Sequence, residues 1–146
     1  MTADATSFSL ALSSPAMSDD ASYSFDYEAG ARILHMRLSG FWSLATLATY
    51  TARLLAEVTR LRVRGEQFDI LSDSRAFDIQ SREVAAGFER IARRGAQMHR
   101  GRTAVVVATQ LSKMQAERAM TAPRLRVFLD SAAARTWLLD ARNTQA

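Results

Sequence analysis

A run of apolar, mostly β-branched residues at positions 103–108 (TAVVVA) constrains the fold of this chain more than any other segment. Such unbroken runs are typical of strands that are covered on both faces, whereas half-exposed strands alternate apolar and polar residues. The run therefore predicts a central strand of a mostly parallel sheet. Because parallel neighbours need long crossover connections, which are usually helices, the chain is predicted to be an α/β protein.

The segments on either side of this run alternate between strand-like and helix-like patterns. Ser22–Glu28 and residues 32–38 are strand-like, and the permissive backbone of Gly30 between them favours a tight antiparallel turn. Further strands are predicted at residues 68–71 and 125–129, and helices after Ser43, Ser81, Thr109 and Asp130 or Ser131. The order predicts one α/β domain with a mixed, mostly parallel sheet of about five strands, an opening antiparallel hairpin and about four flanking helices.

The length of 146 residues suits a single domain. Residues 1–21 are rich in Ser, Ala, Thr and Asp and are predicted to be a disordered N-terminal tail, with Met17 as a candidate start. The domain is expected to span residues 22–141, followed by a C-terminal tail at 142–146. No basic residue precedes the short apolar stretch at residues 8–12, so a secretory signal is not expected.

The composition narrows the function classes. The chain has no cysteine, which fits a reducing cytoplasm, and His35 and His99 are its only histidines, so neither a metal nor another cofactor is expected. It lacks a long uncharged apolar run, so an integral membrane segment is not expected. The net charge of +4 is moderate and acidic residues are interspersed, so nucleic-acid binding is not expected either.

Candidate site residues follow the predicted parallel strands, because ligands of open α/β sheets bind beyond the carboxyl ends of strands. Asp73, Ser74 and Arg75 lie in an expected polar turn after residues 68–71, and Thr109 follows the central strand. The Arg75 guanidinium could meet a carboxylate or phosphate there. The alternative is a turn in which the Asp and Ser side chains only bond nearby backbone.

Two adjacent aromatic residues, Phe41 and Trp42, form a second candidate. Exposed aromatic side chains often anchor a protein partner. The alternative is that they pack in the core, with Trp42 against Leu47 at the start of a helix. The methionines are interpreted as core filler.

The chain from about residue 23 to residue 139 resembles the SpoIIAA-like family, which shares its fold with STAS domains and is related to Sec14-like domains. The likeness rests on the order and spacing of four segments. These are residues 38–42 (LSGFW), 68–75 (FDILSDSR), 103–107 (TAVVV) and 126–138, which begins RVFLD and ends ARTWL.

The resemblance implies a non-enzymatic module for regulation through protein–protein contacts. Anti-sigma-factor antagonists of the STAS type carry a phosphorylatable serine in an Asp-Ser-Ser-Gly stretch where a helix begins. The matching stretch here is Gln80-Ser81-Arg82-Glu83, so only Ser81 is retained and the standard phosphoswitch is not expected. Ser81 is interpreted as a helix cap, with phosphorylation as the alternative.

Three function hypotheses follow. The first is a regulatory interaction module with an unknown protein partner or a second copy of the chain. The second is a binding domain for a small apolar or lipid-like ligand, as the Sec14-like relationship suggests. The third is an enzyme that uses Asp73, Ser74 and Arg75, although no nucleophile motif, nucleotide-binding glycine pattern or paired acid and base is evident.

Overall fold

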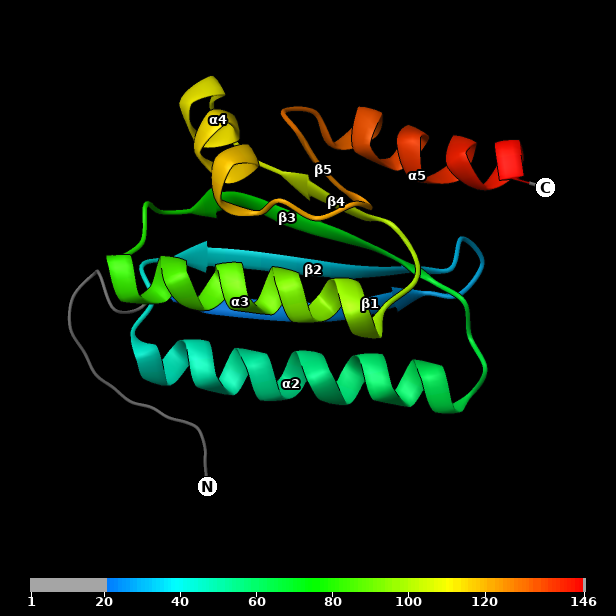
Figure 1. Ribbon diagram of the computed structural model, residues 1–146, viewed down its shortest axis with the longest axis horizontal. Helices are drawn as coiled ribbons and strands as arrows, with labels where there is room; N and C mark the ends of the chain where they lie inside the picture. The colour runs from blue at the N-terminus through cyan, green and yellow to red at the C-terminus, as the bar shows by residue number, and fades with distance from the viewer. Residues whose placement is uncertain (1–20, 146) are drawn as a thin grey trace.

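The computed structural model describes residues 21–145 as one sheet of five strands with four helices (Figure 1). The strands are arranged in sequence order, with β1 and β2 antiparallel and each later pair parallel. This confirms the predicted fold class. The elements are β1 (Ser22–Glu28), β2 (Ile33–Gly40), α2 (Leu44–Val63), β3 (Asp69–Phe77), α3 (Arg82–Met98), β4 (Thr103–Val106), α4 (Gln110–Ala119), β5 (Leu125–Phe128) and α5 (Ser131–Gln145).

The opening hairpin is confirmed, but its turn differs from the predicted one. Gly30 is not the residue with a left-handed backbone; Arg32 is, with φ of 56°. The loop therefore closes at its last residue, where the Arg32 amide donates to the Ala29 carbonyl. The Arg32 carbonyl in turn accepts from the Asp69 amide, so this loop also sets the start of the parallel pairing with β3.

The polar turn expected at residues 72–75 is wrong, because β3 continues through these residues to Phe77. Backbone pairing with β2 extends as far as Gly40 opposite Phe77, with one register shift on the way. The Phe77 ring then returns to the core against Trp42, with ring centroids 5.0 Å apart. The hydrogen bonds between strands join backbone groups and do not depend on side-chain polarity. The strand β3 therefore extends beyond its apolar residues.

Side-chain alternation divides the sheet into two covered faces. One face carries Leu34, Met36 and Ile70 beneath α2 and α3, and continues through Val105 and Val127 beneath α4. The other face carries a smaller cluster covered by α5 (Ile33, Leu71, Ala104, Val106, Ala134 and Leu138). The strand β4 lies between β3 and β5 and contributes to both clusters, which confirms the predicted interior strand covered on both faces.

Capping side chains begin the helices where the sequence indicates. Ser43 accepts from the Thr46 amide at 3.1 Å and Ser81 from the Val84 amide at 3.2 Å. Asp130, rather than Ser131, caps the last helix by accepting from the Ala133 amide at 3.1 Å. That helix continues to Gln145, beyond the expected end of the domain at residue 141. Of the tail predicted at residues 1–21, residues 1–20, including Met17, lie outside the described residues.

Candidate functional site

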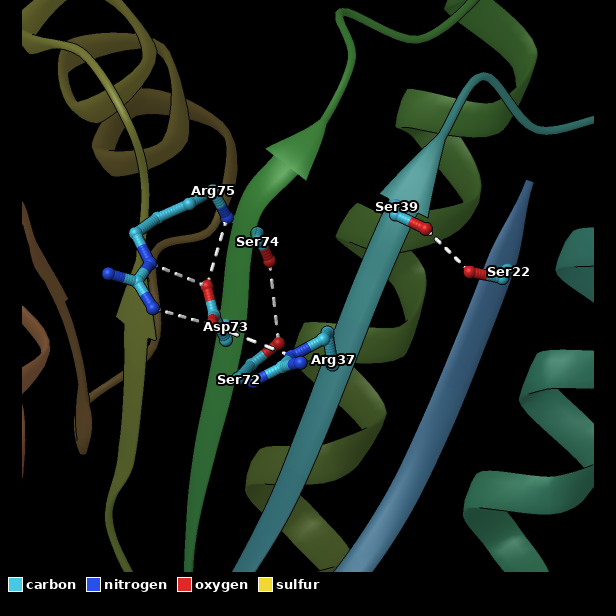
Figure 2. A network of polar contacts seen from close by, with 7 residues as sticks. All are labelled: Ser22, Arg37, Ser39, Ser72, Asp73, Ser74 and Arg75. Carbon is cyan, nitrogen blue, oxygen red and sulfur yellow. Dashed lines mark hydrogen bonds and ion pairs between the residues drawn. The ribbon is translucent and has the colours of Figure 1, made fainter. Parts of the chain in front are cut away.

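The carboxyl half of β3 separates the first group of candidate residues onto opposite faces. Successive side chains of a strand alternate, so Asp73 and Arg75 share the α5 face with Leu71, whereas Ser72 and Ser74 share the other face with Ile70. The structure thus brings Asp73 together with Arg75 but turns Ser74 away from both (Figure 2).

Asp73 and Arg75 form a two-bonded ion pair. Arg75 Nε donates to Asp73 Oδ1 and Arg75 Nη2 to Asp73 Oδ2, both at 2.9 Å, and Arg37 Nε lies 3.8 Å from the same carboxylate (Figure 2). The hydrogen bond from Arg75 is the main cause that lowers the pKa of Asp73. The carboxylate is therefore an acceptor at neutral pH and not a general acid, and an anionic ligand of Arg75 has to compete with Asp73.

Ser81 and Thr109 are helix caps at the same edge of the sheet. Thr109 begins α4, accepting from the Ser112 amide at 3.0 Å and donating to the Ser112 hydroxyl at 2.9 Å. Ser81 begins α3 in the same manner. Within the described part of the chain, no hydrogen bond joins the side chain of Ser81 or Thr109 to Asp73 or Arg75. The structure confirms that Ser81 caps α3, and the phosphorylation of Ser81 stays a prediction.

Phe41 and Trp42 occupy opposite environments. Trp42 is 1% exposed, its Nε1 donates to the Ser39 carbonyl at 2.8 Å, and its ring packs against Tyr50 with centroids 5.1 Å apart. Phe41 is 54% exposed. Trp42 is therefore a core residue, and only Phe41 is available to a partner.

Gln80 has a role that sequence analysis did not identify. Its Oε1 accepts from the Trp42 amide at 2.8 Å, and its Nε2 donates to the Gly40 carbonyl at 2.9 Å. One amide side chain thus joins the loop after β2 to the loop before α3. A carboxylate could not donate to the Gly40 carbonyl, which gives a physical reason for Gln at the position where the phosphoswitch stretch has Asp.

A groove of about 540 Å³ is the second feature that sequence analysis missed. It is lined by residues of α2, α3 and α4 over a floor formed by β2, β3 and β4, on the face that also carries Ser72 and Ser74. Floor residues include Ile70, Thr103 and Val105. The sequence signal for it is the set of small residues that line part of both helices, such as Gly95 and Ala96 on α3 and Ala116 and Ala119 on α4.

Both histidines have structural partners. His35 Nε2 lies 2.8 Å from Glu28 Oε1, and the buried His99 ring donates from Nε2 to the Phe68 carbonyl at 2.7 Å. Burial lowers the pKa of His99, which keeps the ring neutral at neutral pH. Across residues 21–145, His, Asp and Glu side chains form no group of three or more that could hold a metal ion. None of the helices in this part of the chain is both long and apolar enough to span a membrane.

The arrangement of strands and helices defines this chain as an α/β protein with a SpoIIAA-like fold. It is similar to the crystal structure of an uncharacterized DUF3478-family protein with a SpoIIAA-like fold from Shewanella loihica PV-4. The TM-score is 0.62 at 15% sequence identity, over 88% of this chain and 99% of the other. The predicted fold resemblance is thereby confirmed. Neither a family model nor a curated protein matches the sequence.

Proposed function

We propose that this chain is a non-enzymatic regulatory module that binds a protein partner at the carboxyl edge of its parallel strands. The supporting observation is a set of exposed apolar side chains, one after each of four neighbouring strands. They are Phe41 after β2, Ile79 after β3, Leu111 after β4 and Leu129 after β5. Solvent-exposed apolar residues that gather at one place on a surface mark interaction sites.

The partner is a folded protein that offers an apolar patch of its own. The nearby charges favour this chemistry, because Asp73 and Arg75 are paired with one another and a highly charged ligand has to compete with that pair. The same ion pair argues against the enzyme hypothesis, since the Asp73 carboxylate has a lowered pKa and not the raised one that a general acid needs.

Affinity capture with the full chain, followed by binding measurements on the purified partner, tests this proposal. Ile79→Glu is expected to weaken the complex at least about tenfold, because a charge replaces a 71% exposed apolar contact. Val63→Glu is the matched control, since Val63 is 81% exposed at the opposite end of the molecule, where α2 ends. Equal affinity of Ile79→Glu and wild type would contradict the proposal.

A second copy of this chain is the other occupant to test. Sedimentation velocity over a range of concentrations distinguishes a homodimer from a monomer. A dimer that Ile79→Glu dissociates and Val63→Glu preserves would assign the edge to self-association instead of a different partner.

A further inference from the structure

Several of the residues that α3 and α4 contribute to the groove are small. The small residues on this surface include Ala92, Gly95 and Ala96 of α3 and Ala116 and Ala119 of α4. A Cβ added at Gly95 would meet no other atom within 4 Å outside its own helix backbone. The helices therefore leave space over the sheet. The whole groove, which also extends along α2, has a volume of about 540 Å³, within the range of small-molecule sites, roughly 300–1,000 Å³.

Ser72 is an uncompensated polar group in the floor of this groove. It is only 5% exposed, and its neighbours across the sheet on β2 and β4 are Met36 and Val105. Among the described residues, the one hydrogen-bond partner of its side chain is the Ser74 hydroxyl at 3.5 Å, well beyond the usual distance of about 2.7–2.8 Å between hydroxyl oxygens (Figure 2). A buried hydroxyl without a close partner is costly, which favours a ligand that completes its hydrogen bonding.

The charged residues around the groove are exposed or bound to other groups. Arg75 is paired with Asp73, and Arg124 donates to the carbonyls of Gly101, Ala96 and His99. Arg94 and Asp78 are exposed. An ionised ligand group at the floor would therefore lose its hydration without gaining a counter-charge, whereas a neutral oxygen could bond to Ser72.

We infer that this groove is a binding site for a small uncharged amphipathic molecule. The apolar body of the ligand lies along β4 between the helices, and a single alcohol or carbonyl oxygen hydrogen-bonds to the Ser72 hydroxyl. This site lies over β3 and β4 on the helix-covered face. Of the four apolar residues that follow the strand ends, only Ile79 also lines the groove, and the variants below change Ser72 and Gly95 instead, so the test does not depend on the partner-binding proposal.

Titration of the isotope-labelled full chain with octanol, octanoate and octane, followed by amide NMR shifts, tests the inference. Octanol is expected to shift the amides of Ser72, Val105 and Ala116, and octanoate to bind at least about tenfold more weakly at pH 7. Ser72→Ala should weaken octanol binding by roughly three- to tenfold and leave octane binding unchanged, because only the hydrogen bond is lost. Ser22→Ala is the control, since Ser22 is an exposed serine hydrogen-bonded to Ser39 on the adjacent strand (Figure 2).

Two further measurements test whether Ser72 belongs to a ligand site or only stabilises the fold. Gly95→Leu should fill the groove and abolish octanol binding without loss of folding, because leucine is the better helix former. The ligand-free Ser72→Ala protein should unfold at a higher urea concentration than wild type, because an uncompensated buried hydroxyl is removed. Shifts that map outside the groove, octanoate binding as tight as octanol, or unchanged octanol affinity in Ser72→Ala would overturn the inference.

Discussion

Glu28 at the end of β1 and Arg135 in α5, 107 residues apart in the sequence, form a two-bonded ion pair. Arg135 Nη1 donates to Glu28 Oε1 at 2.7 Å and Nη2 to Glu28 Oε2 at 2.8 Å. His35 lies 2.8 Å from the same carboxylate. The pair links the first strand to the last helix, which otherwise packs mainly on β3, β4 and β5.

Glu28→Gln is expected to lower the free energy of unfolding by about 0.5–1 kcal/mol at pH 7, because the pair is partly exposed and screened by solvent. The hydrogen bond from Arg135 is the main cause that lowers the pKa of Glu28 to about 2 from its ordinary value of 4.5. A carboxyl whose pKa is lower in the folded state stabilises the fold above its unfolded pKa. This contribution should therefore be complete above pH 4.5 and should disappear as the pH falls toward 2. Urea unfolding at several pH values measures it.

Glu117→Gln provides the comparison for this prediction, because Glu117 pairs with Lys113 within a single helix. Such local pairs contribute about 0.2–0.5 kcal/mol. Two results would contradict this prediction. One is a Glu28→Gln variant as stable as wild type at pH 7, and the other is a variant that loses as much stability as wild type between pH 4.5 and 2. Either would mean that the ion pair between β1 and α5 contributes nothing measurable.

The adjacent aromatic residues Phe41 and Trp42 should differ widely in their contribution to the free energy of unfolding. Trp42→Ala removes a fully buried ring that contacts Tyr23, Tyr50, Phe77 and Phe88, and is expected to lower the free energy of unfolding by about 3–5 kcal/mol. Phe41→Ala should change it by less than about 0.5 kcal/mol, because the Phe41 ring is largely exposed. Urea denaturation followed by circular dichroism compares the two variants. Similar losses for both would contradict their assignment to core and surface.

The sequence predicted the elements of the fold better than their ends. The apolar run at residues 103–108 and the capping residues Ser43 and Ser81 indicated β4, α2 and α3 correctly, because periodicity and caps are local signals. The carboxyl half of β3 was missed, since its polar residues imitate a turn and only pairing with β2 keeps them extended. Long-range backbone pairing of this kind has no local signal.

The candidate site could be predicted only in part. A turn has no regular side-chain alternation, so the turn predicted at residues 72–75 placed Ser74 with Asp73 and Arg75, whereas the observed strand directs Ser74 to the opposite face. Gln80 was seen only as a departure from a family stretch, because its partners, Gly40 and Trp42, lie about forty residues away. The groove was missed for a similar reason, since small helix residues indicate either close packing or open space until the neighbouring helix is placed.

Two glycines near the end of α3 should respond in opposite directions to alanine. In Gly101→Ala the added methyl would collide with the Phe68 carbonyl oxygen and would lie 2.8 Å from both Asp69 Oδ1 and His99 Nε2. The expected loss of unfolding free energy is about 1–3 kcal/mol. Gly95→Ala should instead gain up to about 1 kcal/mol, because its methyl meets open space and alanine favours the helix. Thermal unfolding of both variants measures these changes in stability. A destabilised Gly95→Ala would show that the groove has no room for a methyl group beside Gly95.

Ser81 offers a final test, which separates a helix cap from a residue that is only tolerated at this position. Ser81→Ala removes the acceptor of the Val84 amide and should lower the free energy of unfolding by about 1 kcal/mol. Ser81→Asp should retain wild-type stability, because aspartate is an equally good cap and its charge suits the amino end of α3. Urea unfolding of the two variants measures this difference. Equal stability of Ser81→Ala and wild type would mean that the cap contributes little, and the retained serine would then need another explanation, with phosphorylation the first to test.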